Sequence, residues 1–195
     1  MQAASPIRIA IFASGSGTNA QRIIDYFAEI PAIEVAILLS NDPEAYALTR
    51  AQNANIATRV FTKAEFKDST VIVDELKEAG ITWIILAGFL WLIPTSLVQA
   101  FPTTMLNIHP ALLPNFGGKG MYGMHVHRAV IETGAKQTGI TIHKVNEEYD
   151  KGEIVFQAAF DVLASDTHET VAEKIHALEY AHFPLVIEEQ IKKSL

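Results

Sequence analysis

The sequence contains no cysteine, which excludes disulfide bonds, thiolate nucleophiles and cysteine metal ligands. Its longest apolar run, Trp83 to Ile93, is too short to cross a bilayer as a helix. The N-terminal segment, residues 1–6, has neither the basic region nor the apolar region of a signal peptide. These absences predict a cytoplasmic protein that does not bind a membrane.

Basic residues are also scarce, with 15 Lys and Arg against 22 Asp and Glu and a formal net charge of -7. A nucleic-acid-binding face needs clustered positive charge, so this balance argues against such a partner. It still allows a local pocket for one phosphate. The 195 residues, 49% of them hydrophobic, suffice for one domain with a substantial core and are too few for two large ones. We therefore expect a single domain over residues 1–195.

Short apolar segments alternate along the chain with segments of helical periodicity. We expect strands over residues 7–13, 35–41, 58–61, 83–87, 107–109, 137–145 and 154–162. Helices are expected over 45–54 and 64–79, the second with Val71, Val73 and Leu76 inward. Another follows residue 19 with the pattern Ile23, Ile24 and Phe27, and others begin near Pro94, His125 and Asp166. This alternation predicts an α/β fold with a single doubly wound, mostly parallel, Rossmann-like sheet and helices on both faces.

A glycine-rich turn, Ser14-Gly-Ser-Gly-Thr-Asn19, lies between the first strand and the first helix. That order directs backbone amides and the helix dipole at a phosphate. The same residues fit the G-x-G-x-x-A dinucleotide pattern, and Asp42 lies where a ribose-binding acid would be expected. An oxidoreductase that binds a dinucleotide is therefore an alternative, and a purely structural glycine turn is another.

The segment Asn107-Ile-His-Pro-Ala-Leu-Leu-Pro114 carries the most informative polar side chains. In an extended strand Asn107 and His109 point the same way, and Pro110 ends the strand just after His109. Ligands of open α/β sheets bind at such carboxyl ends. An amide can donate to a developing oxyanion and an imidazole can carry a proton, so the pair predicts acyl transfer. A structural role in the turn is the alternative.

The segment from Asn107 to Pro114 resembles that of the folate-dependent formyltransferases. The glycine-rich turn, Leu86-Ala-Gly-Phe89, His127-Arg128 and the turn at Asp150 match the same family in the same order. The likeness is greatest to the members that formylate the amine of 5-phosphoribosylglycinamide in purine biosynthesis. It implies 10-formyltetrahydrofolate as co-substrate, small-molecule substrates, no metal, no nucleic acid, and a monomer or homodimer.

The resemblance also implies roles for particular residues. It makes Asn107, His109 and Asp150 catalytic, with Asp150 facing His109, raising its pKa and favouring a protonated imidazole. It assigns phosphoribosylglycinamide to Gly17, Thr18, Asn19, His176 and Glu179, and the folate to Leu90, Trp91, Leu92, Ile93, Asn107, Asn146 and Asp150. Many relatives carry Met-Arg where this chain has Leu90-Trp91, and the Gly-rich loop over 115–124 is longer than the family's turn.

Two further features bear on alternatives. His125-x-His127 suggests a metal site, but it lacks other ligands at fixed spacing, and the resemblance also argues against a metal. Formyltransferases acting on methionyl-tRNA or an amino sugar would share the catalytic residues. The negative net charge opposes tRNA binding. Because the sequence ends at Leu195, without the second domain of the methionyl-tRNA enzymes, we expect the small phosphoribosyl acceptor.

Overall fold

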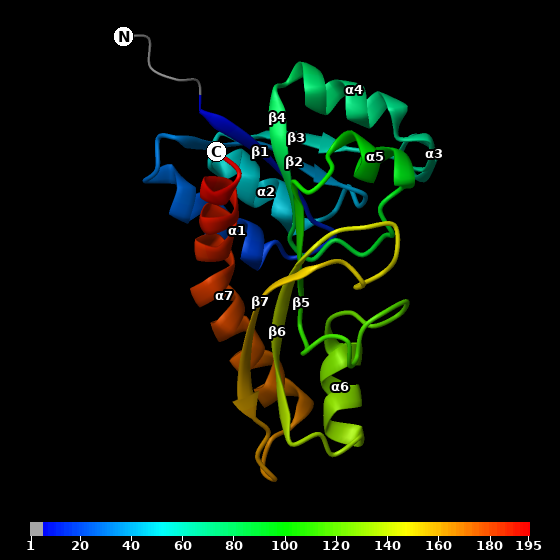
Figure 1. The fold of residues 1–195 in the computed structure, drawn as a ribbon, viewed down its shortest axis with the longest axis vertical. Coiled ribbons are helices and arrows are strands. Elements are labelled where there is room, and N and C mark those ends of the chain that lie inside the picture. Colours follow the sequence, from blue (N-terminus) through cyan, green and yellow to red (C-terminus); the bar gives the residue numbers. More distant parts are fainter. Residues whose placement is uncertain (1–5) are drawn as a thin grey trace. The chain divides into compact units, whose positions relative to one another are not determined.

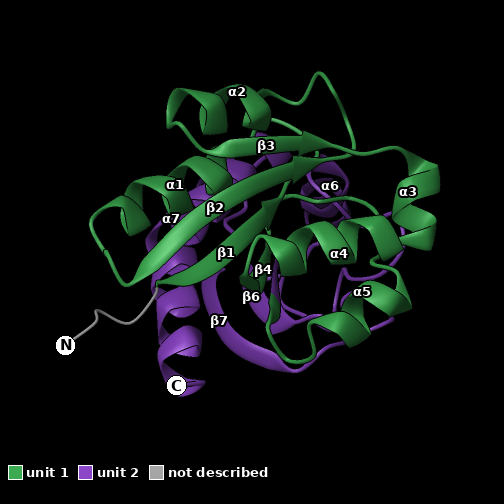
Figure 2. Cartoon of the chain, turned by 90° about the horizontal axis from the view of Figure 1, so that it is seen from above, with its two compact units in different colours: residues 1–105 green, residues 106–195 purple. Residues whose placement is uncertain are grey.

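The computed structural model describes residues 6–195, which form a first compact unit up to residue 105 and a second from residue 106 onward (Figures 1 and 2). Residues 1–5, on which most of the argument against a signal peptide rests, lie outside the described residues. In the described part of the chain, no helix combines the length and apolar character needed to span a bilayer.

The first unit contains four parallel strands in the order β3-β2-β1-β4. The strands are β1 (Ile7–Phe12), β2 (Ile33–Ser40), β3 (Ala57–Val60) and β4 (Ile81–Leu86). The helices are α1 (Thr18–Ala28), α2 (Tyr46–Asn53), α3 (Lys63–Asp68), α4 (Thr70–Glu78) and α5 (Thr95–Ala100). Helices α1 and α2 lie on one face of these strands, and α4 and α5 on the other (Figure 2). The apolar run from Ile9 to Phe12 is fully buried, as expected for a central strand covered on both faces.

The second unit contains three antiparallel strands in the order β5-β6-β7. They are β5 (Met105–His109), β6 (Gln137–Lys144) and β7 (Ile154–Asp161), and the helices are α6 (Met124–Glu132) and α7 (His168–Lys193). Helix α7 packs against β6 and α6. Its N-cap is Thr167, whose hydroxyl accepts a hydrogen bond from the amide of Thr170.

One predicted helix, over residues 64–79, proves to be two. Ser69 interrupts it with a left-handed backbone, φ 52°, so that α3 ends and α4 begins at this residue. The Ser69 side chain is fully buried and its hydroxyl bonds to that of Ser96. Ile72, Val73 and Leu76 are buried, whereas Val71, predicted to point inward, is half exposed because it lies two residues before Val73 and so on the other side of the helix. The expectation for Val71 was therefore wrong.

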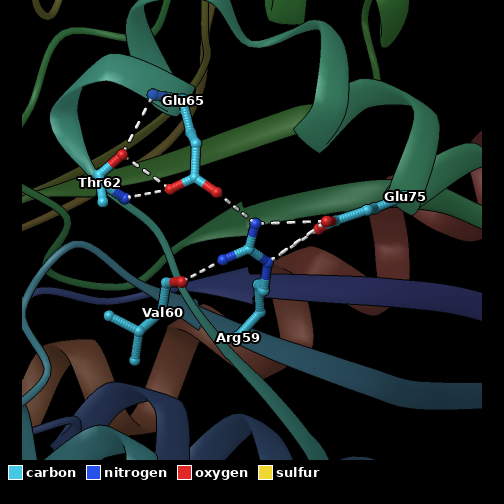
Figure 3. Close-up of polar contacts among 5 residues, drawn as sticks. All are labelled: Arg59, Val60, Thr62, Glu65 and Glu75. Atoms are coloured by element: carbon cyan, nitrogen blue, oxygen red, sulfur yellow. Dashed lines mark hydrogen bonds and ion pairs between the residues drawn. The ribbon is translucent and has the colours of Figure 1, made fainter.

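A network of charged side chains joins β3 to these two short helices (Figure 3). Arg59 on β3 contacts Glu65 on α3 at 2.7 Å and Glu75 on α4 at 3.0 Å. Glu65 also caps α3, because its carboxylate accepts from the Thr62 amide at 2.7 Å. The hydrogen bond from Arg59 and those from Thr62 lower the pKa of Glu65 to about 2. The network fixes both helices to the edge strand of the first unit.

Candidate active site

Strand β5 places Asn107 and His109 on the face opposite to Leu106 and Ile108, which are buried. His109 is the last residue of the strand and only 3% exposed, and Pro110 follows it. In the antiparallel pairing with β6, Asn107 lies opposite His143 and His109 opposite Thr141. The predicted position of His109 at the carboxyl end of a strand is confirmed.

The turn after His109 is held by two side chains of the neighbouring strands. The Thr141 hydroxyl donates to the Ala111 carbonyl at 2.7 Å and accepts from the Leu113 amide at 3.0 Å. The Gln157 amide donates to the Leu113 carbonyl at 3.1 Å and to Thr141 at 2.9 Å. Thr141 is fully buried, so water does not compete for the two bonds between its hydroxyl and the backbone of the turn. They fix the backbone that follows the candidate catalytic histidine.

His143 sets the orientation of the Asn107 amide. The Nδ1 of His143 lies 2.8 Å from the Lys144 carbonyl, which can only accept, so Nδ1 carries the proton. Its Nε2 lies 3.0 Å from Asn107 Nδ2 and 3.6 Å from Asp150 Oδ1. The side-chain amide of Asn107 therefore contacts His143, and that contact leaves at least one N–H of the amide available to another acceptor.

His109 lies between a backbone carbonyl and a carboxylate. Its Nε2 lies 2.8 Å from the Phe116 carbonyl, to which it donates, and its Nδ1 lies 3.6 Å from Asp150 Oδ2. The other carboxylate oxygen of Asp150 lies 3.6 Å from His143 Nε2. Asp150 thus faces both histidines, and the second unit brings the three predicted catalytic residues into one network.

Asp150 is held by the glycine-rich loop over residues 115–124. The Gly118 amide donates to Asp150 Oδ2 at 2.9 Å. A side chain at Gly117 would meet Leu113 Cδ2 at 2.5 Å and Asp150 Cβ at 3.3 Å, so the loop backbone packs tightly here. Phe116 and Asp150 both have positive φ, 54° and 55°, which is uncommon outside glycine and is often found at functional sites.

Burial and charge oppose each other in this network. Burial is the largest influence on His109 and lowers its pKa, while the charge of Asp150 raises it. The net pKa of His109 lies below its ordinary value, which favours the neutral ring. Burial raises the pKa of Asp150, but His143, His109 and the Gly118 amide together lower it below its usual range. The expected direction of the Asp150 influence is found, but in this structure burial outweighs it.

In the first unit, the glycine-rich turn joins two other segments. Gly17 is the N-cap of α1 with φ 69°, a conformation that favours glycine. The Ser14 hydroxyl donates to Asn41 at 2.6 Å and accepts from the Leu90 amide at 3.1 Å, and the Ser14 amide donates to the Gly88 carbonyl at 3.1 Å. The predicted phosphate loop and the start of the predicted folate segment are therefore connected through Ser14.

The residues of the predicted folate segment, 90–93, differ in their exposure to solvent. Leu90 and Leu92 are about two-fifths exposed, at 43% and 41%, whereas Ile93 is buried. Trp91 packs on an aromatic cluster, with ring centroids 5.6 Å from Phe66 and 6.1 Å from Phe61. The two exposed leucines are available to an apolar ligand, while Trp91 and Ile93 anchor the segment to the unit.

The remaining predicted residues lie in the second unit. Asn146 belongs to the same turn as Asp150 and accepts a hydrogen bond from the Glu148 amide at 3.0 Å. On α7, Glu179 is buried, contrary to the usual exposure of an acid on a helix, and His176 is exposed and stacks on Tyr180 with 5.9 Å between centroids.

His127 lies in the core of the second unit rather than in a cluster of ligands. Burial lowers its pKa to about 4, and the charges of His176, His168 and His109 act in the same direction. Its Nδ1 has no hydrogen-bond partner among the described residues. Residues 6–195 contain no group of three or more His, Asp or Glu side chains placed to hold a metal ion.

Several contributing residues were not predicted from the sequence. His143 and Thr141 are two residues apart in the predicted strand over 137–145 and so share a face, but nothing in the sequence indicated that they contact Asn107 and the turn after His109. The backbone contacts of Phe116 and Gly118 were also unforeseen, because a backbone group leaves no residue-type signal. The register of β5 against β6 is what brings these groups together.

Comparison with known proteins places these features in context. Residues 7–187 match the formyl transferase family. The chain is 43% identical to the chloroplastic phosphoribosylglycinamide formyltransferase of Arabidopsis thaliana, with 95% of this chain and 67% of that protein covered. It is 37% identical to phosphoribosylglycinamide formyltransferase of Haemophilus influenzae, with 92% and 85% covered.

Solved structures agree with the sequence comparison. Phosphoribosylglycinamide formyltransferase from Bacillus halodurans matches with a TM-score of 0.87 and 36% identity over 96% of this chain and 97% of that one. Glycinamide ribonucleotide transformylase 1 from Symbiobacterium toebii matches with a TM-score of 0.85 and 36% identity over 95% and 87%. These matches confirm the predicted fold class, α/β with a doubly wound, mostly parallel sheet.

Proposed function

Because the chain belongs to the formyl transferase family, we propose that it is a phosphoribosylglycinamide formyltransferase of purine biosynthesis. It transfers the formyl group of 10-formyltetrahydrofolate to the amine of 5-phosphoribosylglycinamide. The observation that carries this proposal is the network in which Asp150 lies 3.6 Å from His109 and Asn107 contacts His143. This arrangement provides an oxyanion donor beside a proton-carrying pair.

The substrate amine attacks the formyl carbon, and the electrons of the C=O bond move to the formyl oxygen. The Asn107 N–H that His143 leaves available stabilises that oxygen. His109 is neutral before the reaction, and negative charge developing beside it raises its pKa and favours the imidazolium. Nε2 of His109 already donates to the Phe116 carbonyl. The formyl oxygen must therefore share this donor with the carbonyl or take the place of the carbonyl. Asp150 assists a water that relays a proton from the attacking amine to the folate nitrogen, and the bond between the formyl carbon and that nitrogen then breaks and releases tetrahydrofolate.

Binding roles follow from the same proposal. Gly17, Thr18 and Asn19 hold the phosphate, and His176 and Glu179 contact the sugar end of the ribonucleotide. Leu90, Trp91, Leu92, Ile93 and Asn146 contact the folate, together with Asn107 and Asp150. We further propose that residues 1–195 act as one domain, as a cytoplasmic monomer or homodimer, without a metal.

The test is a choice of acceptors. The purified protein should formylate phosphoribosylglycinamide with 10-formyltetrahydrofolate and should not formylate methionyl-tRNA. NADH should not compete with the folate donor for binding. Formylated tRNA with unmodified ribonucleotide would contradict the acceptor, and binding of NADH without any formyl transfer would favour a dinucleotide enzyme.

A further inference from the structure

Arg50 on α2 makes two contacts that fix its guanidinium beside the glycine-rich turn. Its Nε donates to the carbonyl oxygen of Ser16 at 2.8 Å. Its Cζ lies 4.9 Å from the ring centroid of Tyr46, one helical turn earlier, in a cation–π contact. Because both the Nε–H and the face of the guanidinium are in contact, this side chain has less conformational freedom than an ordinary surface arginine.

The N-terminal end of α2 holds the carbonyl groups of the turn. The Ala47 amide donates to the Gly15 carbonyl at 3.0 Å, next to the bond from Arg50 to Ser16. A side chain at Gly17 would lie 2.6 Å from Ala47 Cα, so the two backbones are in direct contact. Two successive carbonyl groups of the turn are thus engaged by α2.

The amides of the turn are engaged differently. Within residues 6–195, those of Gly15, Ser16 and Gly17 donate no hydrogen bond to a backbone carbonyl. Successive amides of a loop whose carbonyls are held elsewhere form a concave site for an anion. Helix α2 therefore bonds the carbonyl groups of the turn, whereas the amide groups of the turn can face a ligand.

The charge of Arg50 is also not neutralised by a carboxylate of the described chain. Arg8 and Arg59 in the same unit both form ion pairs with glutamates at 3.0 Å or less. Arg50 forms none among residues 6–195, and its bonded partner is a neutral carbonyl. A positive charge next to amides that bond no backbone carbonyl favours an anionic ligand.

We propose that Arg50 is a positioning residue of the phosphate site: it holds the Ser16 carbonyl so that the amides of residues 15–17 converge, together with Thr18 and Asn19, on the phosphate of the substrate. This inference rests on the proposed function, which supplies the phosphate. Tyr46 orients the guanidinium, and the charge of Arg50 adds to the attraction for the dianion.

The test variant is Arg50→Met, which keeps a long apolar side chain against Tyr46 but removes the donor and the charge. The KM for phosphoribosylglycinamide should rise roughly tenfold or more, the effect of losing a charge-assisted hydrogen bond. The turnover number and the KM for the folate should stay within about twofold. Arg50→Lys should restore part of the affinity, because Nζ can still donate to Ser16.

Two comparisons separate positioning from a general loss of structure. Arg8→Met removes the same charge at the opposite, amino-terminal end of β1 and should leave the KM unchanged. Activity toward the dephosphorylated glycinamide riboside, already weak, should not fall further in Arg50→Met. Equal losses for both acceptors, or an unchanged KM for the phosphorylated one, would overturn the role of Arg50.

Binding of inorganic phosphate, followed by the NMR shifts of the Gly15, Ser16 and Gly17 amides, tests the inference without catalysis. The wild-type amides should shift on titration, and in Arg50→Met they should need roughly tenfold more phosphate. Unchanged titration would refute the inference while leaving the formyl transfer assay to judge the proposed function. A wild-type protein that binds phosphate at these amides but transfers no formyl group would refute the proposed function alone.

Discussion

The glycine-rich turn of the first unit and the catalytic network of the second are built from different parts of the chain. The turn offers backbone amides and is held mainly by contacts to its own carbonyls, such as Ala47 to Gly15. The network uses buried side chains, with His109 only 3% exposed. A site made of backbone depends on conformation, and a site made of buried side chains depends on charge and burial. Substitutions in the two regions should therefore affect different kinetic parameters.

The largest effect is expected in the network. Asn107→Ala and His109→Ala should each lower the turnover number at least ~100-fold, because each group acts on charge that exists only in the transition state. The KM for the ribonucleotide should change little. Steady-state kinetics with both substrates, with circular dichroism to verify folding, would measure this. Near-normal turnover in either variant would remove that residue from the mechanism.

The turn should respond in KM instead. Gly17→Val places a branched residue at φ 69° and a Cβ 2.6 Å from Ala47 Cα, so the loop must move. The KM for the ribonucleotide should rise roughly tenfold, as when a charge-assisted hydrogen bond is lost, with a smaller change in turnover.

Gly134→Val is the matched control for that substitution, since it places the same branched residue at a similar φ of 64° outside the turn, with nothing within 4 Å of an added Cβ. It should leave the KM for the ribonucleotide near that of the wild type. If only the KM for the folate changes in Gly17→Val, the turn binds the donor or a dinucleotide, and the contrast between the two regions is wrong.

The two regions also differ in how far the sequence predicts them. Glycine spacing after an apolar strand indicates the turn, and Asn107, His109 and Asp150 are visible as residue types in a family pattern. The residues that hold both sites in place cannot be recognised in the sequence. Arg50 contacts a residue of the turn that is 34 positions away, and His143 contacts Asn107 only because of the register of β5 and β6.

The split of the predicted 64–79 helix has a similar cause. Neither proline nor glycine marks the break in the sequence, and the left-handed backbone of Ser69 is accompanied by a buried contact with the distant Ser96. Hydrophobic periodicity predicts helices and strands, but it does not predict which distant side chain will contact a break within a helix.

The burial of His127 in the second unit predicts a pH dependence of stability. His127 has a pKa of about 4 in the folded protein, below its ordinary value, so the unfolded chain binds a proton that the folded chain does not. Its contribution to stability is present above about pH 6.5 and is lost as the pH falls toward 4. Urea unfolding at pH 7, 6 and 5 should show this loss.

His127→Gln should reduce the slope of that loss, whereas His125→Gln, on the exposed side of the same helix, should keep it. Identical slopes for the wild type and the two variants would mean that His127 does not carry the pH dependence.

The smallest expected effect is a shift in one titration, and it isolates charge within the catalytic network. Asp150→Asn keeps the shape of the side chain but removes the charge that raises the pKa of His109. Burial then acts with less opposition, so the pKa of His109 should fall further below its ordinary value. The measurement is the NMR titration of the His109 ring protons in the wild type and the variant. Glu148→Gln, in the same turn but exposed and paired with Lys151, should leave that titration unchanged. If Asp150→Asn also leaves it unchanged, the 3.6 Å contact carries no electrostatic coupling, and Asp150 must act on the water that relays the proton rather than on His109.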